Sequence, residues 1–128
     1  MSQDAEAGGR AVLVVEDDPL VLLTVRYTLE AAGYRVVSAT SLEEAVARWS
    51  QEGAGLGLVL SDLALGQASG VELAGPLRPK GLATPVVFMS GLRAQDVERH
   101  TGLAAGGVLR KPFSREELLD RVAGALAR

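Results

Sequence analysis

The chain has 128 residues, 48% of them hydrophobic, and a formal net charge of −3 at pH 7. This composition can bury the core of one domain without disulfides or a structural metal, and the absence of cysteine excludes thiolate metal sites and cysteine nucleophiles. The basic residues are scattered, unlike a nucleic-acid-binding stripe, and no apolar run approaches the ~20 residues that span a membrane. We therefore expect a cytoplasmic protein that binds neither nucleic acid nor membrane.

Residues 1–10 are small, polar and acidic, and they lack the apolar core of a signal peptide. They predict a disordered lead-in to a single domain over residues 11–128. No internal repeat or low-complexity segment indicates a further domain in that range.

The first strand and the first helix follow this lead-in. The apolar run at residues 11–15 predicts a strand. Asp18 followed by Pro19 is typical of a helix N-cap and of the first helical position. Gly33 suits the residue just beyond the end of that helix.

The second strand and helix are marked by a short apolar pair and a capping motif. Val36 and Val37 predict a brief strand, and residues 41–44 predict a capping box that opens a helix to about Gln51. The apolar run at residues 58–61 then predicts a third strand, buried on both faces, whose carboxyl end is followed by a carboxylate.

The second half of the chain has weaker helical patterns between its apolar runs. The runs predict strands at residues 85–89 and 107–110, and short helices are expected at residues 70–77 and 94–100. A second capping box at residues 114–117 opens the last helix. The apolar face of that helix consists of Leu118, Leu119, Val122 and Leu126.

Five strands that alternate with helices predict an α/β fold. We expect a single doubly wound, five-stranded parallel sheet in the order 2-1-3-4-5, flanked by five helices, as in flavodoxin-like proteins. In such a sheet, ligands bind where the carboxyl ends of the strands meet.

Three carboxylates are predicted to gather at that edge. Asp17 and Asp18 follow the first strand and Asp62 follows the third, and these strands are neighbours in the expected order. Two unit charges ~4 Å apart repel by about 4 kcal/mol at an effective dielectric constant of 20, so the cluster needs a cation or protons. Carboxylate oxygens with room for water suit Mg²⁺. Asp18 could equally serve as the helix cap, and the two roles are compatible.

Two further polar residues end the fourth and fifth strands. Ser90 can donate a hydrogen bond to an anionic oxygen, and the Lys111 ammonium is a compact charge suited to phosphate. With Asp62 as a carboxylate nucleophile and Mg²⁺ to neutralise charge, these groups are the parts required for phosphoryl transfer.

With these residues in place, the chain resembles the response-regulator receiver domain of two-component signalling, over roughly residue 11 to the C-terminus. The residues that carry the resemblance are Asp17, Asp18, Asp62, Gly70, Ser90, Lys111 and Pro112. The resemblance implies that Asp62 accepts a phosphoryl group from a histidine kinase or a histidine phosphotransfer protein. It also implies that the domain catalyses only its own phosphorylation and dephosphorylation.

The resemblance implies a magnesium site as well. Asp18, Asp62 and the backbone carbonyl of Ala64 would ligate Mg²⁺, and Asp17 would assist through water.

The family's switch implies roles for the residues around the phosphoryl group. Ser90 would swing toward it, Lys111 would form a salt bridge with it, and the Lys111–Pro112 peptide would be cis. The downstream protein partner would bind a surface formed by residues 94–101, 107–110 and 114–127.

The chain departs from the family pattern at several positions. Leu65 and Gly66 stand where receivers commonly have Met-Pro, and Val108 stands at the aromatic switch position, so the usual coupling of that ring to Ser90 is not expected. Ala64 and Leu92 cannot position an attacking water by hydrogen bonding, which predicts a long-lived aspartyl phosphate.

Other interpretations stay open at this point. The chain, which ends with its last helix, is expected to lack an output domain and could be a free-standing regulator, a phosphate sink or a hybrid-kinase receiver. A receiver-fold interaction module that is never phosphorylated is the main alternative. A dehalogenase-type enzyme would need an acidic residue at position 64, and a flavodoxin-like module would need a Ser/Thr-rich loop after the first strand.

Overall fold

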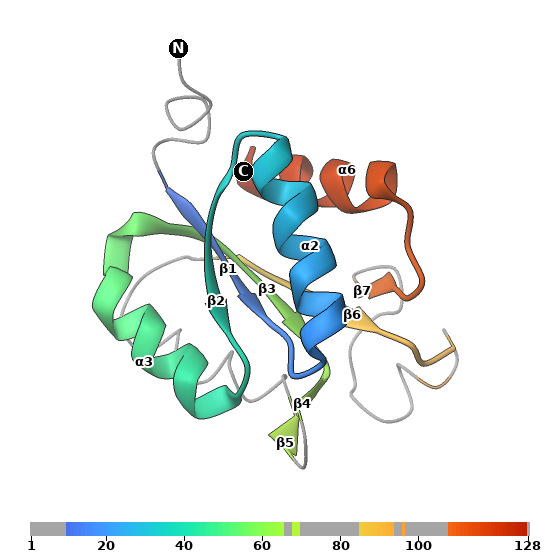
Figure 1. The fold of residues 1–128 in the computed structure, drawn as a ribbon, viewed down its shortest axis with the longest axis horizontal. Helices are drawn as coiled ribbons and strands as arrows, with labels where there is room; N and C mark the ends of the chain where they lie inside the picture. Colours follow the sequence, from blue (N-terminus) through green and yellow to red (C-terminus); the bar gives the residue numbers. More distant parts are fainter. Residues whose placement is uncertain (1–9, 66–67, 70–84, 94–95, 97–107, 128) are drawn as a thin grey trace.

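The computed structural model describes residues 10–65, 68–69, 85–93, 96 and 108–127. Within these residues, five strands form one sheet and three α-helices pack against it (Figure 1). The strands of the sheet are β1 (Ala11–Val15), β2 (Arg35–Ala39), β3 (Leu56–Asp62), β6 (Val86–Ser90) and β7 (Val108–Arg110). The α-helices are α2 (Pro19–Ala31), α3 (Leu42–Glu52) and α6 (Arg115–Leu126).

The sheet has the predicted topology. Its strand order is β2-β1-β3-β6-β7, and each pair of neighbouring strands is parallel, so the expected order 2-1-3-4-5 is confirmed. The register pairs Val15 with Ser61 and Ser90 with Arg110. The carboxyl ends of the strands therefore lie along one edge of the sheet.

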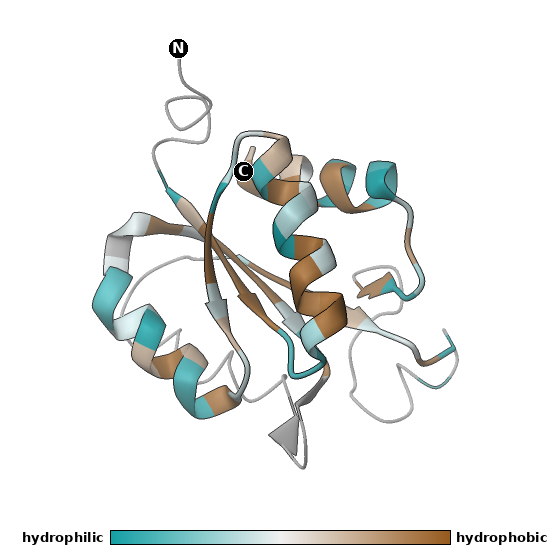
Figure 2. Cartoon of the chain, in the orientation of Figure 1, coloured by the Kyte–Doolittle hydropathy of each residue, from teal (hydrophilic) through white to brown (hydrophobic). Residues whose placement is uncertain are grey.

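Helices cover both faces of the sheet and bury it. Val12 and Val14 of β1 pack in a core with residues of α2 and α6, whereas Leu13 and Val15 pack in a second core with α3. This alternation follows from the two-residue period of a strand. Trp49 of α3 anchors the second core and is 2% exposed. Figure 2 shows hydrophobic strands between the helices, with hydrophobic residues also along the lower part of α2 and a mixture of hydrophobic and hydrophilic residues on α3 and α6.

The first helix begins and ends as the sequence predicts. Asp18 is the N-cap of α2, and its Oδ1 accepts hydrogen bonds from the backbone N–H groups of Leu20 (2.9 Å) and Val21 (3.4 Å). Pro19 occupies the first helical position. Gly33 follows the helix with a φ of 98°, a conformation that L side chains rarely adopt.

Of the two predicted capping boxes, one is complete. In α6, Ser114 and Glu117 cap each other's backbone N–H groups. In α3, Ser41 Oγ accepts from the Glu44 N–H at 3.1 Å, but the Glu44 carboxylate binds the N–H of Thr40 instead, at 2.7 Å. The predicted capping box at Ser41 is therefore only half formed, since the Glu44 carboxylate does not bind the N–H of Ser41.

The chain leaves β3 through a short hairpin. A 3₁₀ turn at Gly53–Gly55 precedes β3, which begins two residues earlier than predicted. Beyond β3, β4 (Ala64–Leu65) pairs antiparallel with β5 (Ala68–Ser69). The hairpin was not expected from the sequence.

Some sequence predictions lie outside the described residues. These are the disordered lead-in over residues 1–9, the helix at 70–77 and nearly all of the helix at 94–100. No helix among the described residues is long and apolar enough to cross a membrane.

Candidate functional site

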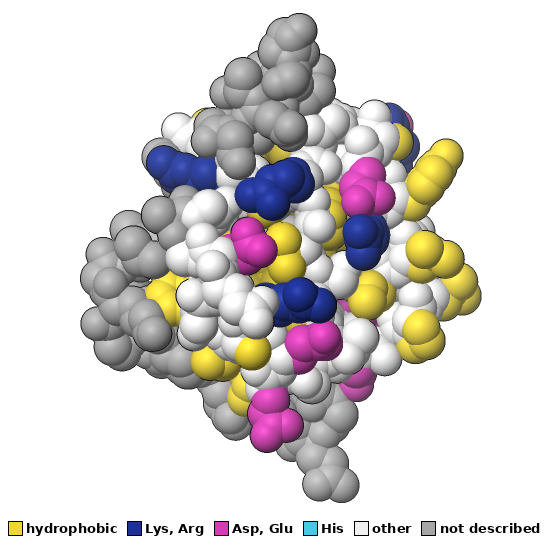
Figure 3. All heavy atoms as spheres, turned by 60° about the vertical axis from the view of Figure 1, so that its left-hand side comes forward, with side chains coloured by type: hydrophobic (Ala, Val, Ile, Leu, Met, Phe, Trp, Pro, Cys, Tyr) yellow, Lys and Arg dark blue, Asp and Glu magenta, His cyan; other side chains and the backbone are white. Residues whose placement is uncertain are grey.

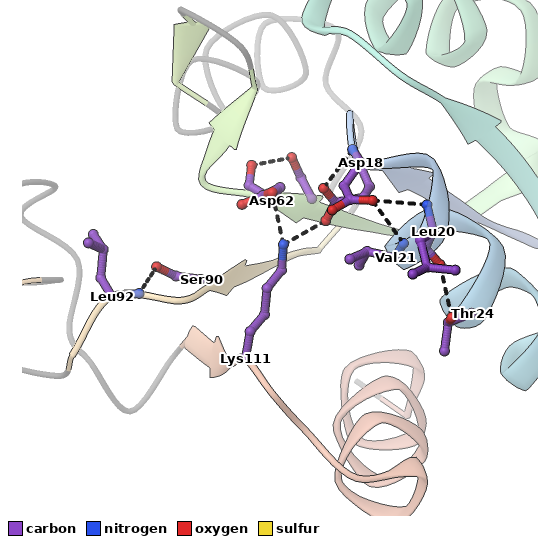
Figure 4. A network of polar contacts seen from close by, with 10 residues as sticks. Asp18, Leu20, Val21, Thr24, Asp62, Ser90, Leu92 and Lys111 are labelled. Carbon is purple, nitrogen blue, oxygen red and sulfur yellow. Dashed lines mark hydrogen bonds and ion pairs between the residues drawn. The ribbon is translucent and has the colours of Figure 1, made fainter.

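The candidate site lies at the edge where the strands of the sheet end. Glu16 and Asp17 follow β1. Asp62 is the last residue of β3, and Lys111 follows β7 (Figure 4). Because these strands run parallel, residues that are up to 95 positions apart in the chain come together at this edge.

Three carboxylates form a cluster there. One oxygen from each of Glu16, Asp17 and Asp62 lies within 4.8 Å of the other two. The side chains of Glu16 and Asp62 point inward, since these residues are only 1% and 8% exposed, whereas Asp17 is exposed. Grouped carboxylate oxygens with one solvent-facing member fit the ligand preference of Mg²⁺.

The Lys111 ammonium bridges two of these carboxylates. Its Nζ lies 2.7 Å from Glu16 Oε1 and 2.9 Å from Asp62 Oδ2. Burial acts to lower the pKa of Lys111, but the hydrogen bonds to both carboxylates outweigh it, so the pKa is raised above its usual value. The lysine therefore stays charged beside Asp62.

Glu16 is the buried member of the cluster. Burial raises the pKa of Glu16, and the hydrogen bonds from Lys111 and from the Asp18 N–H only partly offset this effect. The Glu16 N–H donates to the Ala39 carbonyl at 3.0 Å, which fixes its backbone at the sheet edge.

The carboxylates that the structure brings together differ from the predicted set by one residue. The sequence prediction grouped Asp17, Asp18 and Asp62, but the cluster contains Glu16 in place of Asp18. The Asp18 carboxylate instead caps α2. The missed signal was the two-residue period of β1, because Val12, Val14 and Glu16 alternate onto the face that Leu58, Leu60 and Asp62 also share.

Ser90 ends β6 at the same edge, and its hydroxyl faces a turn. Ser90 is 3% exposed, and its Oγ accepts a hydrogen bond from the Leu92 N–H at 2.9 Å. The Ser90 carbonyl accepts from the Lys111 N–H at 2.7 Å. The Lys111–Pro112 peptide is cis, as predicted.

Val108 is packed against an aromatic side chain on the neighbouring strand. Val108 and Phe88 are register partners, and with Leu63 they form a small buried cluster. The aromatic ring that is absent at position 108 is thus present on the neighbouring strand, at Phe88.

An apolar groove of about 480 Å³ adjoins the lysine. Its walls are Leu20, Val21, Thr24, Val25, Lys111, Pro112 and Phe113. Beside it, the outward-facing Leu20, Leu23 and Tyr27 of α2 are 71%, 64% and 72% exposed. In Figure 3, hydrophobic side chains project from the edge of the molecule where α2 lies, and the face in view mixes acidic and basic side chains.

Comparisons with known proteins identify the family to which the chain is similar. Residues 12–123 match the family model for the response regulator receiver domain. The chain is 35% identical over 119 residues to the transcriptional regulatory protein TrcR of Mycobacterium tuberculosis (91% of this chain, 45% of TrcR). It is 30% identical over 121 residues to the alkaline phosphatase synthesis transcriptional regulatory protein PhoP of Bacillus subtilis (93% of this chain, 49% of PhoP). It thus spans about half the length of these relatives.

A solved structure gives the same result for the fold. The receiver domain of the hybrid histidine kinase CckA superimposes with a TM-score of 0.74 at 28% identity, covering 91% of this chain and 98% of that domain.

We predict that Mg²⁺ stabilises the fold through the carboxylate cluster. At ten times its dissociation constant, the ion should raise the free energy of unfolding by about 1.4 kcal/mol, a shift of about 5 °C in melting temperature for a domain of this size. Asp17→Asn should remove most of this shift in a thermal melt. Asp18→Asn is the matched control, because asparagine caps a helix as well as aspartate does. If both variants lost the Mg²⁺-dependent shift in melting temperature equally, Asp18 would be a ligand of the metal site.

Proposed function

The chain belongs to the response regulator receiver domain family, and we propose that Asp62 is the residue on which it accepts a phosphoryl group. This family carries the phosphorylation switch of two-component signalling. The observation that carries the assignment is the contact of Lys111 Nζ with the carboxylates of Asp62 and Glu16. A phosphoacceptor needs both a buried carboxylate and a nearby cation that can hold phosphoryl oxygens.

Receiver domains bind Mg²⁺ at an acidic pocket, and we assign that role here to Glu16, Asp17 and Asp62, with the backbone carbonyl of Ala64. The cluster geometry supports the three side chains, and the position of Ala64 just beyond β3 supports the carbonyl. When bound, Mg²⁺ neutralises charge between the Asp62 carboxylate and the oxygens of an incoming phosphoryl group.

The proposed donor is a histidine kinase or a histidine phosphotransfer protein. An Asp62 carboxylate oxygen bonds to phosphorus while the phosphorus–nitrogen bond of the donor's phosphohistidine breaks, and the electron pair of that bond leaves with the imidazole, which gains a proton from water. Lys111 and the Ser90 hydroxyl bind the phosphoryl oxygens. The protein then acts on no other substrate, so it catalyses only its own phosphorylation and dephosphorylation.

The remaining assignments follow from this role. The family match over residues 12–123 supports one receiver domain at 11–128. The proposed phosphotransfer from a kinase supports a cytoplasmic location for this activity. The proposed downstream surface is formed by residues 94–101, 107–110 and 114–127, of which 94–95, 97–101 and 107 lie outside the described residues. The exposed outer side of α6 supports its described part.

A receiver-fold interaction module that is never phosphorylated is the second candidate. The burial of Val108 against Phe88 favours it, because no ring at position 108 can move between inward and outward positions.

Labelling with acetyl phosphate and Mg²⁺ tests the central proposal. We expect the wild-type chain to gain the mass of one phosphoryl group and Asp62→Asn to gain none, because an amide is a poor nucleophile. Asp18→Asn, which leaves the acidic cluster intact, should still be labelled. Failure of the wild type to react with acetyl phosphate, and to bind beryllofluoride with Mg²⁺, would favour the interaction module.

The lifetime of the phosphorylated protein is a separate prediction. Leu92, two residues after Ser90, is 39% exposed and carries no group that can position water. Dephosphorylation in Mg²⁺ should therefore take minutes or longer, followed by mass after removal of the phosphodonor. Leu92→Gln supplies hydrogen-bonding groups and should shorten the half-life, whereas Leu92→Met should not. A wild-type half-life of seconds would contradict this.

We also propose that the phosphodonor docks on the exposed apolar side of α2 and the adjoining groove. This surface is continuous with Lys111 and therefore lies beside Asp62. Exposed apolar patches of this kind mark protein-binding sites.

The double variant Leu20→Gln, Leu23→Gln should slow phosphotransfer from a kinase that labels the wild type, by about tenfold or more for the loss of two apolar contacts. Labelling by acetyl phosphate should be unchanged, because a small donor needs no docking surface. Ala47→Gln on α3 introduces the same side chain at another exposed helical position and serves as the control. Equal slowing with both donors would place the defect in the reaction site and not in docking.

A further inference from the structure

The turn that follows β6 holds the hydroxyl of Ser90 away from Asp62. Ser90 Oγ accepts from the Leu92 N–H at 2.9 Å. Figure 4 shows the Ser90 side chain directed at Leu92, to one side of the contact between Lys111 and Asp62. To bind a phosphoryl group on Asp62, the hydroxyl has to turn away from this position.

Arg110 holds the same turn from the neighbouring strand. Its Nε donates to the Leu92 carbonyl at 3.0 Å. Arg110 is the register partner of Ser90 in the β6–β7 ladder. The Leu92 residue is therefore bound at both ends, its N–H by the Ser90 hydroxyl and its carbonyl by the Arg110 side chain.

We propose that Arg110 is a positioning residue for Ser90. By holding the Leu92 carbonyl, it keeps the Leu92 N–H on the Ser90 hydroxyl and opposes the rotation of that hydroxyl toward a phosphoryl group on Asp62. This inference rests on the proposed role of Asp62. Its structural half, the restraint of the turn, stands on the two hydrogen bonds alone.

The position of Arg110 next to Lys111 links the restraint of the turn to the site. The residue precedes Lys111, whose ammonium contacts Asp62 and whose N–H donates to the Ser90 carbonyl at 2.7 Å. The consecutive residues Arg110 and Lys111 thus hold Ser90 by its backbone and restrain its hydroxyl through Leu92. A change in Lys111 on phosphorylation is therefore close enough to release the turn.

A simpler role for Arg110 is that of an exposed cation that attracts anionic donors. Two substitutions separate the roles because both remove the charge. In Arg110→Gln, the side-chain amide nitrogen is as many bonds from Cα as the arginine Nε and can still donate to the Leu92 carbonyl. In Arg110→Met, a chain of similar length offers no donor.

The first measurement is the affinity for beryllofluoride in the presence of Mg²⁺, by calorimetry on the full chain. We expect Arg110→Met to bind about threefold more tightly than Arg110→Gln, the ratio expected for one exposed hydrogen bond. Equal affinities in the two variants, or weaker binding by Arg110→Met, would overturn the proposal. Because the contact is exposed, both variants should unfold at the wild-type midpoint, and a shared loss of stability would not produce a difference between them.

The second measurement needs no phosphate mimic. Hydrogen exchange of the Leu92 amide should be faster in Arg110→Met than in Arg110→Gln, because the turn opens more often without its restraint. Equal exchange rates would show that Arg110 does not hold the turn. If the wild type fails to bind beryllofluoride at all, the proposed role of Asp62 fails, and the exchange rates still decide the restraint separately.

Discussion

The ion pair between Lys111 and the two buried carboxylates is the interaction on which the site depends. Glu16 and Asp62 are almost completely withdrawn from solvent, and their Lys111 contacts are 2.7 and 2.9 Å. Removing one partner of such a pair leaves a buried charge unpaired, which typically costs about 3–5 kcal/mol. The pair therefore constrains where β1, β3 and β7 end relative to one another. Among the described residues, Lys111 contacts two of the three clustered carboxylates.

Much of this arrangement could be predicted from local sequence. Each strand of the sheet appears as a short apolar run, and the polar residue that follows it lies at one edge once the strands are parallel, as Asp62 and Lys111 show. The position of Asp18 outside the cluster has a physical cause. An aspartate before Pro19 is equally suited to a cap and to a ligand, and local pattern cannot separate the roles. The alternation of Val12 and Val14 predicts that Glu16 shares a face with Asp62, but it does not decide the role of Asp18.

Other features depend on contacts between distant segments and could not be predicted from any local pattern. The sequence shows that Val108 is smaller than an aromatic residue. It does not show that Phe88 packs beside it, because this neighbour is determined by the register of β6 and β7. Cores conserve total volume better than they conserve volume at single positions. A ring on β6 therefore satisfies the packing near the site without providing a mobile aromatic on β7.

The backbone at the site is more firmly held than the side chains that carry its chemistry. Hydrogen bonds of the sheet type continue one residue beyond the strands, from Glu16 N to Ala39 O, from Leu63 N to Met89 O and from Lys111 N to Ser90 O. A new charge on Asp62 therefore cannot easily move the strand ends. It acts on the side chains of Lys111 and Ser90, whose present partners are another carboxylate and a turn N–H. The turn at Leu92 lies outside the sheet, beyond β6. A rearrangement of these two side chains therefore changes the protein surface at this turn and leaves the packing of the core unchanged.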